Sequence, residues 1–106
     1  MNATPKMLSY LGFAAKARKL VSGGQAAELA IKKGQALLVL IEEDAADNTK
    51  KQFSDMSSYR EIPFFVVGGE LGRAVGHGER KIIAITDAGF AAAVKKEINL
   101  NLGGKE

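Results

Sequence analysis

The sequence contains no cysteine and no tryptophan, and it has one histidine and two prolines. Without cysteine there can be no disulfide, thiolate nucleophile or thiolate metal site. This residue usage fits a reducing compartment, and we expect the protein to be cytoplasmic. Aromatic residues make up only 7% of the chain, so aliphatic side chains must fill most of the core.

Long hydrophobic runs are also missing. No apolar run approaches the roughly 20 residues that span a bilayer. Residues 1–6 carry one lysine with no long apolar stretch after it, so the sequence predicts no signal peptide. We therefore expect no membrane partner.

The chain has 106 residues, of which 46% are hydrophobic and 25% charged. These values are ordinary for one globular domain. We expect a single domain over residues 1–102 and a flexible tail at 103–106. The net charge is +3 and the pI is about 9.3. A pI above about 9 is common in nucleic-acid-binding domains, but the placement of the charge decides its meaning.

Helical and apolar segments alternate along the chain. The run ALLVLI at 36–41 predicts a central strand that is covered on both faces. Further strands are expected at 19–21, 64–67 and 81–86, and helices at 5–17, 23–33, 44 or 47 to 58, 70–75 and 88–98. Thr4, Ser22, Asp44 or Asp47, and Asp87 are the expected N-caps, and Gly34 is expected to end the second helix. The alternation predicts an α/β layered sheet, but it does not fix the strand order.

An enzyme has little support. His77 lies between Gly76 and Gly78, where a catalytic role competes with that of an ordinary solvated loop residue. One histidine without cysteine also argues against a transition-metal site. We expect no catalytic residue and no metal.

The acidic trio Glu42, Glu43 and Asp44 follows a predicted buried strand. Such carboxylates can perform acid–base chemistry or hold a hard cation, but they also favour helix starts, and we prefer the second interpretation. The glycines at 68, 69, 72 and 76 match neither the dinucleotide nor the P-loop pattern. We expect no cofactor.

A basic segment is the strongest functional signal. Lys16, Arg18 and Lys19 precede Ser22-Gly23-Gly24-Gln25, where small residues open a predicted helix. Helix amino ends bind phosphates, and nearby cations attract nucleic acid. A solvated helix end without a partner is the equally weighted alternative.

Five segments together carry a resemblance that covers nearly the whole chain: LGFAAKARKLVSG (11–23), ALLVLIEEDAADNT (36–49), IPFF (62–65), LGRAVG (71–76) and IIAITDAGFA (82–91). The chain resembles the kink-turn RNA-binding family of ribosomal proteins, of the L-seven-Ae type, and within it the bacterial YlxQ-like subgroup. The resemblance implies a three-layer α/β/α sandwich with a small mixed four-stranded sheet. It also implies binding to RNA that is bent sharply by tandem sheared G·A pairs.

In this family the start of the second helix enters the RNA groove, and the loop after LGRAVG touches flanking nucleotides. We therefore expect a ribosomal-protein-like binder of ribosomal or regulatory RNA, whether ribosome-associated or not, in an oligomeric state that the sequence does not give. The expected RNA-binding residues are Lys16, Arg18, Lys19, Ser22, Gly23, Gly24, Gln25, Glu28, Leu29, Lys32, Glu43, Asp44, Gly76, His77, Gly78 and Arg80.

The second helix departs from the family pattern Gly-x-Asn-Glu-x-x-Lys. Gly23 is kept, and Gln25 can still hydrogen-bond a base edge. Ala26 replaces the glutamate and Leu29 replaces the lysine, so two polar side chains that could contact the RNA are lost. Helical geometry places Leu29 about 160° from Ile31 and predicts that it faces outward. The alternative function is a protein-interaction module that has lost specific RNA readout.

Overall fold

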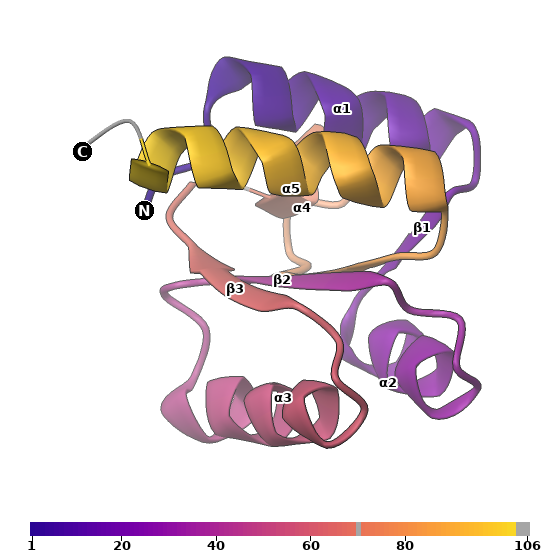
Figure 1. The fold of residues 1–106 in the computed structure, drawn as a ribbon. Coiled ribbons are helices and arrows are strands. Elements are labelled where there is room, and N and C mark those ends of the chain that lie inside the picture. The colour runs from indigo at the N-terminus through magenta and orange to yellow at the C-terminus, as the bar shows by residue number, and fades with distance from the viewer. Residues whose placement is uncertain (70, 104–106) are drawn as a thin grey trace.

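The computed structural model, which describes residues 1–69 and 71–103, has three layers, with helices on both faces of one sheet (Figure 1). One face carries α1 (Pro5–Lys16), α4 (Leu71–Ala74) and α5 (Ala88–Gly103), and the other carries α2 (Gly24–Lys32) and α3 (Asp47–Tyr59). The sheet consists of β1 (Leu20–Ser22), β2 (Leu38–Glu42), β3 (Phe64–Val67) and β4 (Ile82–Ile85). The predicted α/β/α sandwich with a mixed four-stranded sheet is confirmed.

The strand order β1-β4-β2-β3 brings several loops to one end of the sheet. β2 pairs with β3 in parallel, and β4 is antiparallel to both β1 and β2. The carboxyl ends of β1, β2 and β3 therefore lie at the same end as the amino end of β4. The β1–α2, β2–α3 and α4–β4 connections meet there, which is where the candidate site forms.

The two faces of the sheet bury separate sets of side chains. Because side chains alternate along a strand, Leu38 and Leu40 pack toward α1 and α5, while Val39 and Ile41 pack toward α2 and α3. All five residues of β2 are buried. ALLVLI therefore belongs to a central strand, as its continuous hydrophobicity predicts.

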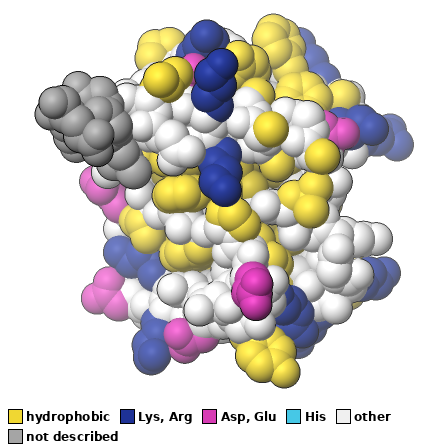
Figure 2. All heavy atoms as spheres, viewed as in Figure 1, with side chains coloured by type: hydrophobic (Ala, Val, Ile, Leu, Met, Phe, Trp, Pro, Cys, Tyr) yellow, Lys and Arg dark blue, Asp and Glu magenta, His cyan; other side chains and the backbone are white. Residues whose placement is uncertain are grey.

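β3 is an edge strand, so it is less buried than β2. Phe64 and Phe65 are half-buried and Val66 is 38% exposed. Figure 2 shows hydrophobic side chains gathered over this strand, between α5 and α3. β3 lies at the end of the strand order and pairs with β2 on one side. Its apolar sequence alone did not predict this edge position.

Two predicted caps are confirmed. Thr4 Oγ1 accepts a hydrogen bond from Met7 N at 3.1 Å, and Asp87 Oδ2 accepts one from Phe90 N at 2.9 Å. Gly34 follows α2 with φ of +73°, as expected for a glycine after a helix. α5 extends past the predicted end at residue 98 to Gly103; residues 104–106 of the expected tail lie outside the described residues.

The other two caps were predicted wrongly. Ser22 is the last residue of β1, and the N-cap of α2 is Gly23, which makes no side-chain cap. The N-cap of α3 is Ala46, so neither Asp44 nor Asp47 caps it. Asp47 is the first residue of that helix, and Asp44 instead pairs with Lys81. Across the described residues, no helix is long and apolar enough to cross a membrane.

Candidate nucleic-acid interface

The amino end of α2 is open to solvent. Gly24 and Gln25 are exposed, and a Cβ on Gly24 would have no atom within 4 Å. Gly23 adopts φ of +92° and ψ of 154°, and its N–H donates to Ile82 O at 2.9 Å, which ties the turn to β4. The first amides of a helix have no acceptor within it, and no side chain caps α2. The helix start is therefore available to an anionic ligand.

Arg80 lies against this turn. Its Nη1 donates to Ser22 Oγ at 3.0 Å and lies 3.4 Å from Ser22 O, across 58 residues of sequence. Its side chain runs along Gly23, since a Cβ there would lie 3.5 Å from Arg80 Cδ. These contacts hold a guanidinium group beside the exposed amides, so charge and hydrogen-bond donors converge on one small area.

The α4–β4 loop holds Arg80 in position. His77 N donates to Gly72 O at 2.8 Å, and Arg80 N donates to His77 O at 3.0 Å. A Cβ on Gly72 would collide with the carbonyl oxygens of His77 and Arg80. Gly76 turns the chain with φ of +87°. The loop therefore closes tightly against α4 and leaves His77 exposed.

An ion pair joins the loop after β2 to the start of β4. Lys81 Nζ lies 2.9 Å from Asp44 Oδ2, and both side chains are exposed. The hydrogen bond from Lys81 lowers the pKa of Asp44 from its usual 3.8, and the same bond raises the pKa of Lys81. Asp44 is therefore ionised at neutral pH and neutralises a lysine beside the α2 turn.

A cleft of 330 Å³ lies between these loops. It is lined by Gly23, Gly24, Ile41, Ala45, Ala46, Thr49, Glu79, Arg80, Lys81 and Ile82. Small apolar groups form much of its lining. The cations that line it each lie close to a carboxylate, since Arg80 Nε is 3.8 Å from Glu79 Oε2 and Lys81 pairs with Asp44. A planar, partly polar group such as a nucleobase has suitable chemistry for such a cleft.

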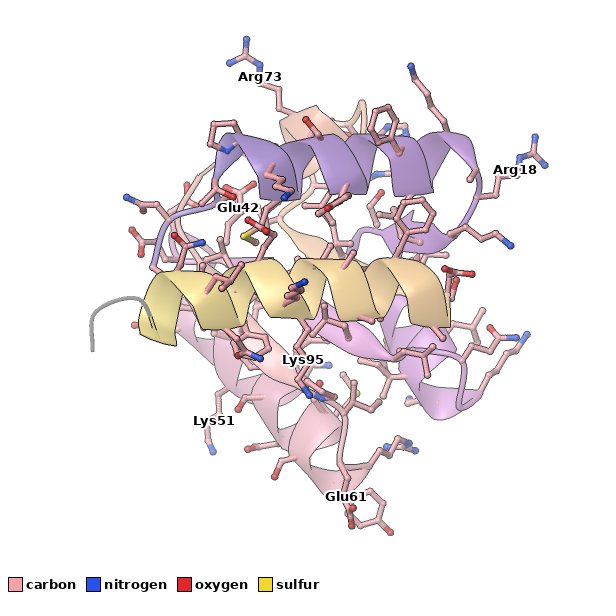
Figure 3. All side chains as sticks on the ribbon, turned by 45° about the horizontal axis from the view of Figure 1, so that its top comes forward. Arg18, Glu42, Lys51, Glu61, Arg73 and Lys95 are labelled. Carbon is pink, nitrogen blue, oxygen red and sulfur yellow. The ribbon has the colours of Figure 1, made fainter. Side chains whose placement is uncertain are left out.

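The acidic trio does not form a joint site. Glu42 is buried, and its Oε2 lies 3.4 Å from Gly72 N in the first turn of α4 (Figure 3). The carboxylate of Glu43 lies toward Gly68, because a Cβ there would be 3.2 Å from it, whereas Asp44 turns to Lys81. No group of three histidine, cysteine or acidic residues suited to a metal occurs in the described part of the chain.

The outer face of α2 continues from the cleft. Gln25 is exposed, and Leu29 is 53% exposed, as helical geometry predicted. Glu28 and Lys32 form an i,i+4 ion pair with Oε2 and Nζ 2.7 Å apart. This face therefore presents an amide and an apolar side chain, flanked by a charge-neutral pair.

The basic segment before β1 does not lie at the α2 start. Arg18 and Lys19 precede β1 and Ser22 ends it, so a strand of about 10 Å separates them. Lys19 Nζ lies 3.9 Å from Asp87 Oδ1 at the beginning of α5. Lys16 lies in a groove between α1 and α4. RNA contacts by these three residues therefore remain predictions.

The sequence analysis missed several residues that line the cleft, among them two with polar side chains. Lys81 and Thr49 line it beside Arg80, yet neither has a local motif. Their contribution depends on the antiparallel pairing of β4 with β2, which brings the loops together. The adjacency of Glu79, Arg80 and Lys81 to the third buried strand was the available signal.

Comparison with known proteins places the chain in a family. The sequence model of the family described as "Ribosomal protein L7Ae/L30e/S12e/Gadd45 family" matches residues 5–95. The chain is 42% identical over 83 residues to "RNA-binding protein YlxQ" of Bacillus subtilis (strain 168), covering 76% of this chain and 83% of the relative. It is 36% identical over 95 residues to "RNA-binding protein YlxQ" of Enterococcus faecium, covering 88% and 91%.

Solved structures agree in fold. A Bacillus halodurans C protein described as of unknown function superposes with a TM-score of 0.85 and 41% identity, covering 91% of this chain and 99% of that one. The Giardia lamblia 15.5kD RNA binding protein superposes with a TM-score of 0.74 at 19% identity, covering 92% of each; at this identity it supports the fold alone. With the family match over most of its length, the chain belongs to the "Ribosomal protein L7Ae/L30e/S12e/Gadd45 family", with relatives of the YlxQ type.

Proposed function

We propose that the protein binds structured RNA, of the kink-turn or a similarly bent kind, at the exposed start of α2 and the adjoining cleft. The observation that supports this proposal most directly is the open Gly23–Gln25 turn, with the Arg80 guanidinium held against it. The names of the two YlxQ relatives, both RNA-binding proteins, support the same class of ligand. A cytoplasmic RNA, ribosomal or regulatory, is the proposed partner.

The chemistry of the site suits a bent RNA better than a regular duplex. The deep, narrow major groove of A-form RNA does not admit side chains, whereas irregular internal loops expose base edges. The free amides of α2 and Arg80 can bind backbone phosphates. Gln25 can donate to and accept from a base edge, and the 330 Å³ cleft can receive a base that has left its stack.

A second candidate is a protein-interaction module on the same fold. Leu29, 53% exposed where the family pattern has lysine, favours it. Ala26 likewise cannot read a base edge. On this alternative the charge would attract RNA weakly and without regard to its shape.

Titration of a fluorescent kink-turn RNA, with a duplex of matched length lacking the G·A pairs, tests the proposal. We expect the protein to bind the kink-turn RNA more tightly than the duplex. The ratio of the two affinities should persist as the salt concentration is raised. Equal, weak and strongly salt-dependent binding to both RNAs would reject specific recognition. Arg80→Gln should weaken the kink-turn complex, while Arg60→Gln, an exposed cation after α3, serves as the matched control.

A further inference from the structure

A second groove lies between α1 and α4, next to the candidate interface. It has a volume of 420 Å³ and is lined by Gly12, Phe13, Lys16, Arg73, Ala74 and Val75, among others. A Cβ on Gly12 would lie 3.3 Å from Ala74 O, so the two helix backbones approach closely at its floor. The side chains on either side form its walls.

The walls combine one exposed aromatic ring with two cations. Phe13 is 59% exposed, and Lys16, three residues later, lies on the same side of α1. Arg73 is exposed on α4, and Figure 3 shows it pointing outward from that helix. None of the described residues that line the groove carries a carboxylate. The groove is therefore suited to an anionic ligand that carries flat rings.

The groove is continuous with the candidate interface. Ala15 and Val75 line both this groove and a neighbouring cleft of 280 Å³, and that cleft reaches Ser22, His77 and Arg80. A polymer bound at the α2 start can therefore extend through this cleft into the α1–α4 groove. This continuity favours an extension of the same ligand over an unrelated partner.

We propose that the α1–α4 groove binds unpaired nucleotides that flank the bent RNA, with a base stacked on Phe13 and phosphates facing Lys16 and Arg73. Aromatic stacking with basic flanks is the usual way to hold single-stranded nucleic acid without sequence preference. The inference rests on the proposed function, because the RNA must first be seated at α2.

The test compares a blunt kink-turn RNA with the same RNA carrying a short run of unpaired uridines at one end or the other. We expect the wild-type protein to bind one extended RNA about fivefold or more tightly than the blunt one. A fivefold change in affinity corresponds to about 1 kcal/mol, the lower end of the stacking free energy of one base on an aromatic side chain. Phe13→Ala should remove that gain and leave blunt-RNA affinity unchanged. Phe13→Leu keeps the apolar bulk and should also lose most of the gain.

Matched controls separate stacking from general effects. Tyr59, an aromatic residue 84% exposed on α3, lies outside the groove, so Tyr59→Ala should keep the full gain. Lys16→Gln and Arg73→Gln should each reduce the slope of log affinity against log salt by about 0.7 more for the extended RNA than for the blunt RNA.

Two results would overturn the inference. If neither extended RNA binds more tightly than the blunt RNA, while the blunt RNA is still preferred over the duplex, the groove does not hold flanking nucleotides and the proposed function stands. If Tyr59→Ala loses the gain as fully as Phe13→Ala, the gain does not arise in the groove. Loss of the kink-turn preference itself would instead reject the proposed function, so the two failures are distinguishable.

Discussion

Two adjacent glycines at the start of α2 should respond oppositely to alanine. Gly23 has φ of +92° and ψ of 154°, a region that is essentially restricted to glycine. Its Cβ would meet Arg80 Cδ at 3.5 Å, an ordinary contact, so the penalty arises from the backbone. We expect Gly23→Ala to lower the free energy of unfolding by about 1–3 kcal/mol, which corresponds to roughly 4–8 °C in Tm per kcal/mol.

Gly24 is the first residue of α2, and a Cβ there meets no atom within 4 Å. Gly24→Ala should therefore keep or raise stability, by up to about 1 kcal/mol, because alanine favours the helix. The added methyl group projects into the space where the RNA backbone is proposed to approach. We expect the affinity for kink-turn RNA to fall about tenfold, the effect of losing one charge-assisted hydrogen bond of about 1.5 kcal/mol.

Urea unfolding of both variants and anisotropy titration with kink-turn RNA measure the two effects separately. Gly23→Ala should shift the unfolding midpoint down, whereas Gly24→Ala should leave the midpoint unchanged or raise it and should weaken RNA binding. A Gly24→Ala protein that is as unstable as Gly23→Ala would contradict the geometry of the turn. A stable Gly24→Ala protein with wild-type RNA affinity would refute the close approach of RNA to this turn.

Three further substitutions probe the same end of the sheet. Leu29→Lys restores the residue of the family pattern and should tighten kink-turn binding by about 1–3 kcal/mol if it contacts a base, or steepen the salt dependence if it contacts a phosphate; unchanged affinity in titration would mean that α2 is docked differently. Asp44→Asn should release Lys81 and increase both RNA affinity and the salt slope, by about 0.7–0.9 for one added phosphate contact. Because the pKa of Asp44 is lowered, its contribution to stability is present above its ordinary pKa of 3.8 and is lost only as the pH falls through the folded value. Titration of Asp44 should therefore cause no change in wild-type stability with pH near neutrality; pH-resolved melting of the wild type and Asp44→Asn that shows a difference varying with pH in that range would contradict this. Gly72→Ala would place a Cβ against the carbonyl oxygen of Arg80 and should destabilise the protein by about 1–3 kcal/mol, measured by thermal melting, and an unchanged Tm would show that the loop is looser than described.

Local signals predicted the elements of the fold well. Thr4 and Asp87 each stand three residues before the amide that they accept from, so sequence spacing was sufficient to identify these caps. The continuous apolar run at 36–41 correctly predicted a strand buried on both faces. These features depend on residues that are close together in the chain.

Contacts between residues that are distant in the chain were not predicted from local signals. Asp44 or Asp47 was expected to cap α3, but Asp47 is the first residue of that helix and the Asp44 carboxylate binds Lys81, 37 residues away. Ser22 was expected to cap α2, but it ends β1 and accepts from Arg80 across 58 residues. Both contacts follow from the placement of β4 between β1 and β2, which the sequence pattern did not determine.

The candidate site was predicted in part. Gly24 and Gln25 are exposed, as RNA binding at this turn requires, whereas Gly23 is half-buried. Lys19 was expected beside them, but β1 separates it from the α2 start, and its Nζ lies 3.9 Å from Asp87 Oδ1. The α1–α4 groove was not anticipated, because Phe13 and Arg73 meet only when α4 packs on α1, and neither position has a recognisable spacing with the other.

The most direct test of the central claim is the perturbation of backbone amide NMR signals by a kink-turn RNA. If the RNA docks on the open end of α2, the largest shifts should occur at Gly24, Gln25 and Ala26 and in the α4–β4 loop around Arg80, with α3 nearly unchanged. Shifts that concentrate on α3 or on the β3 edge, with the first turn of α2 unaffected, would contradict the account.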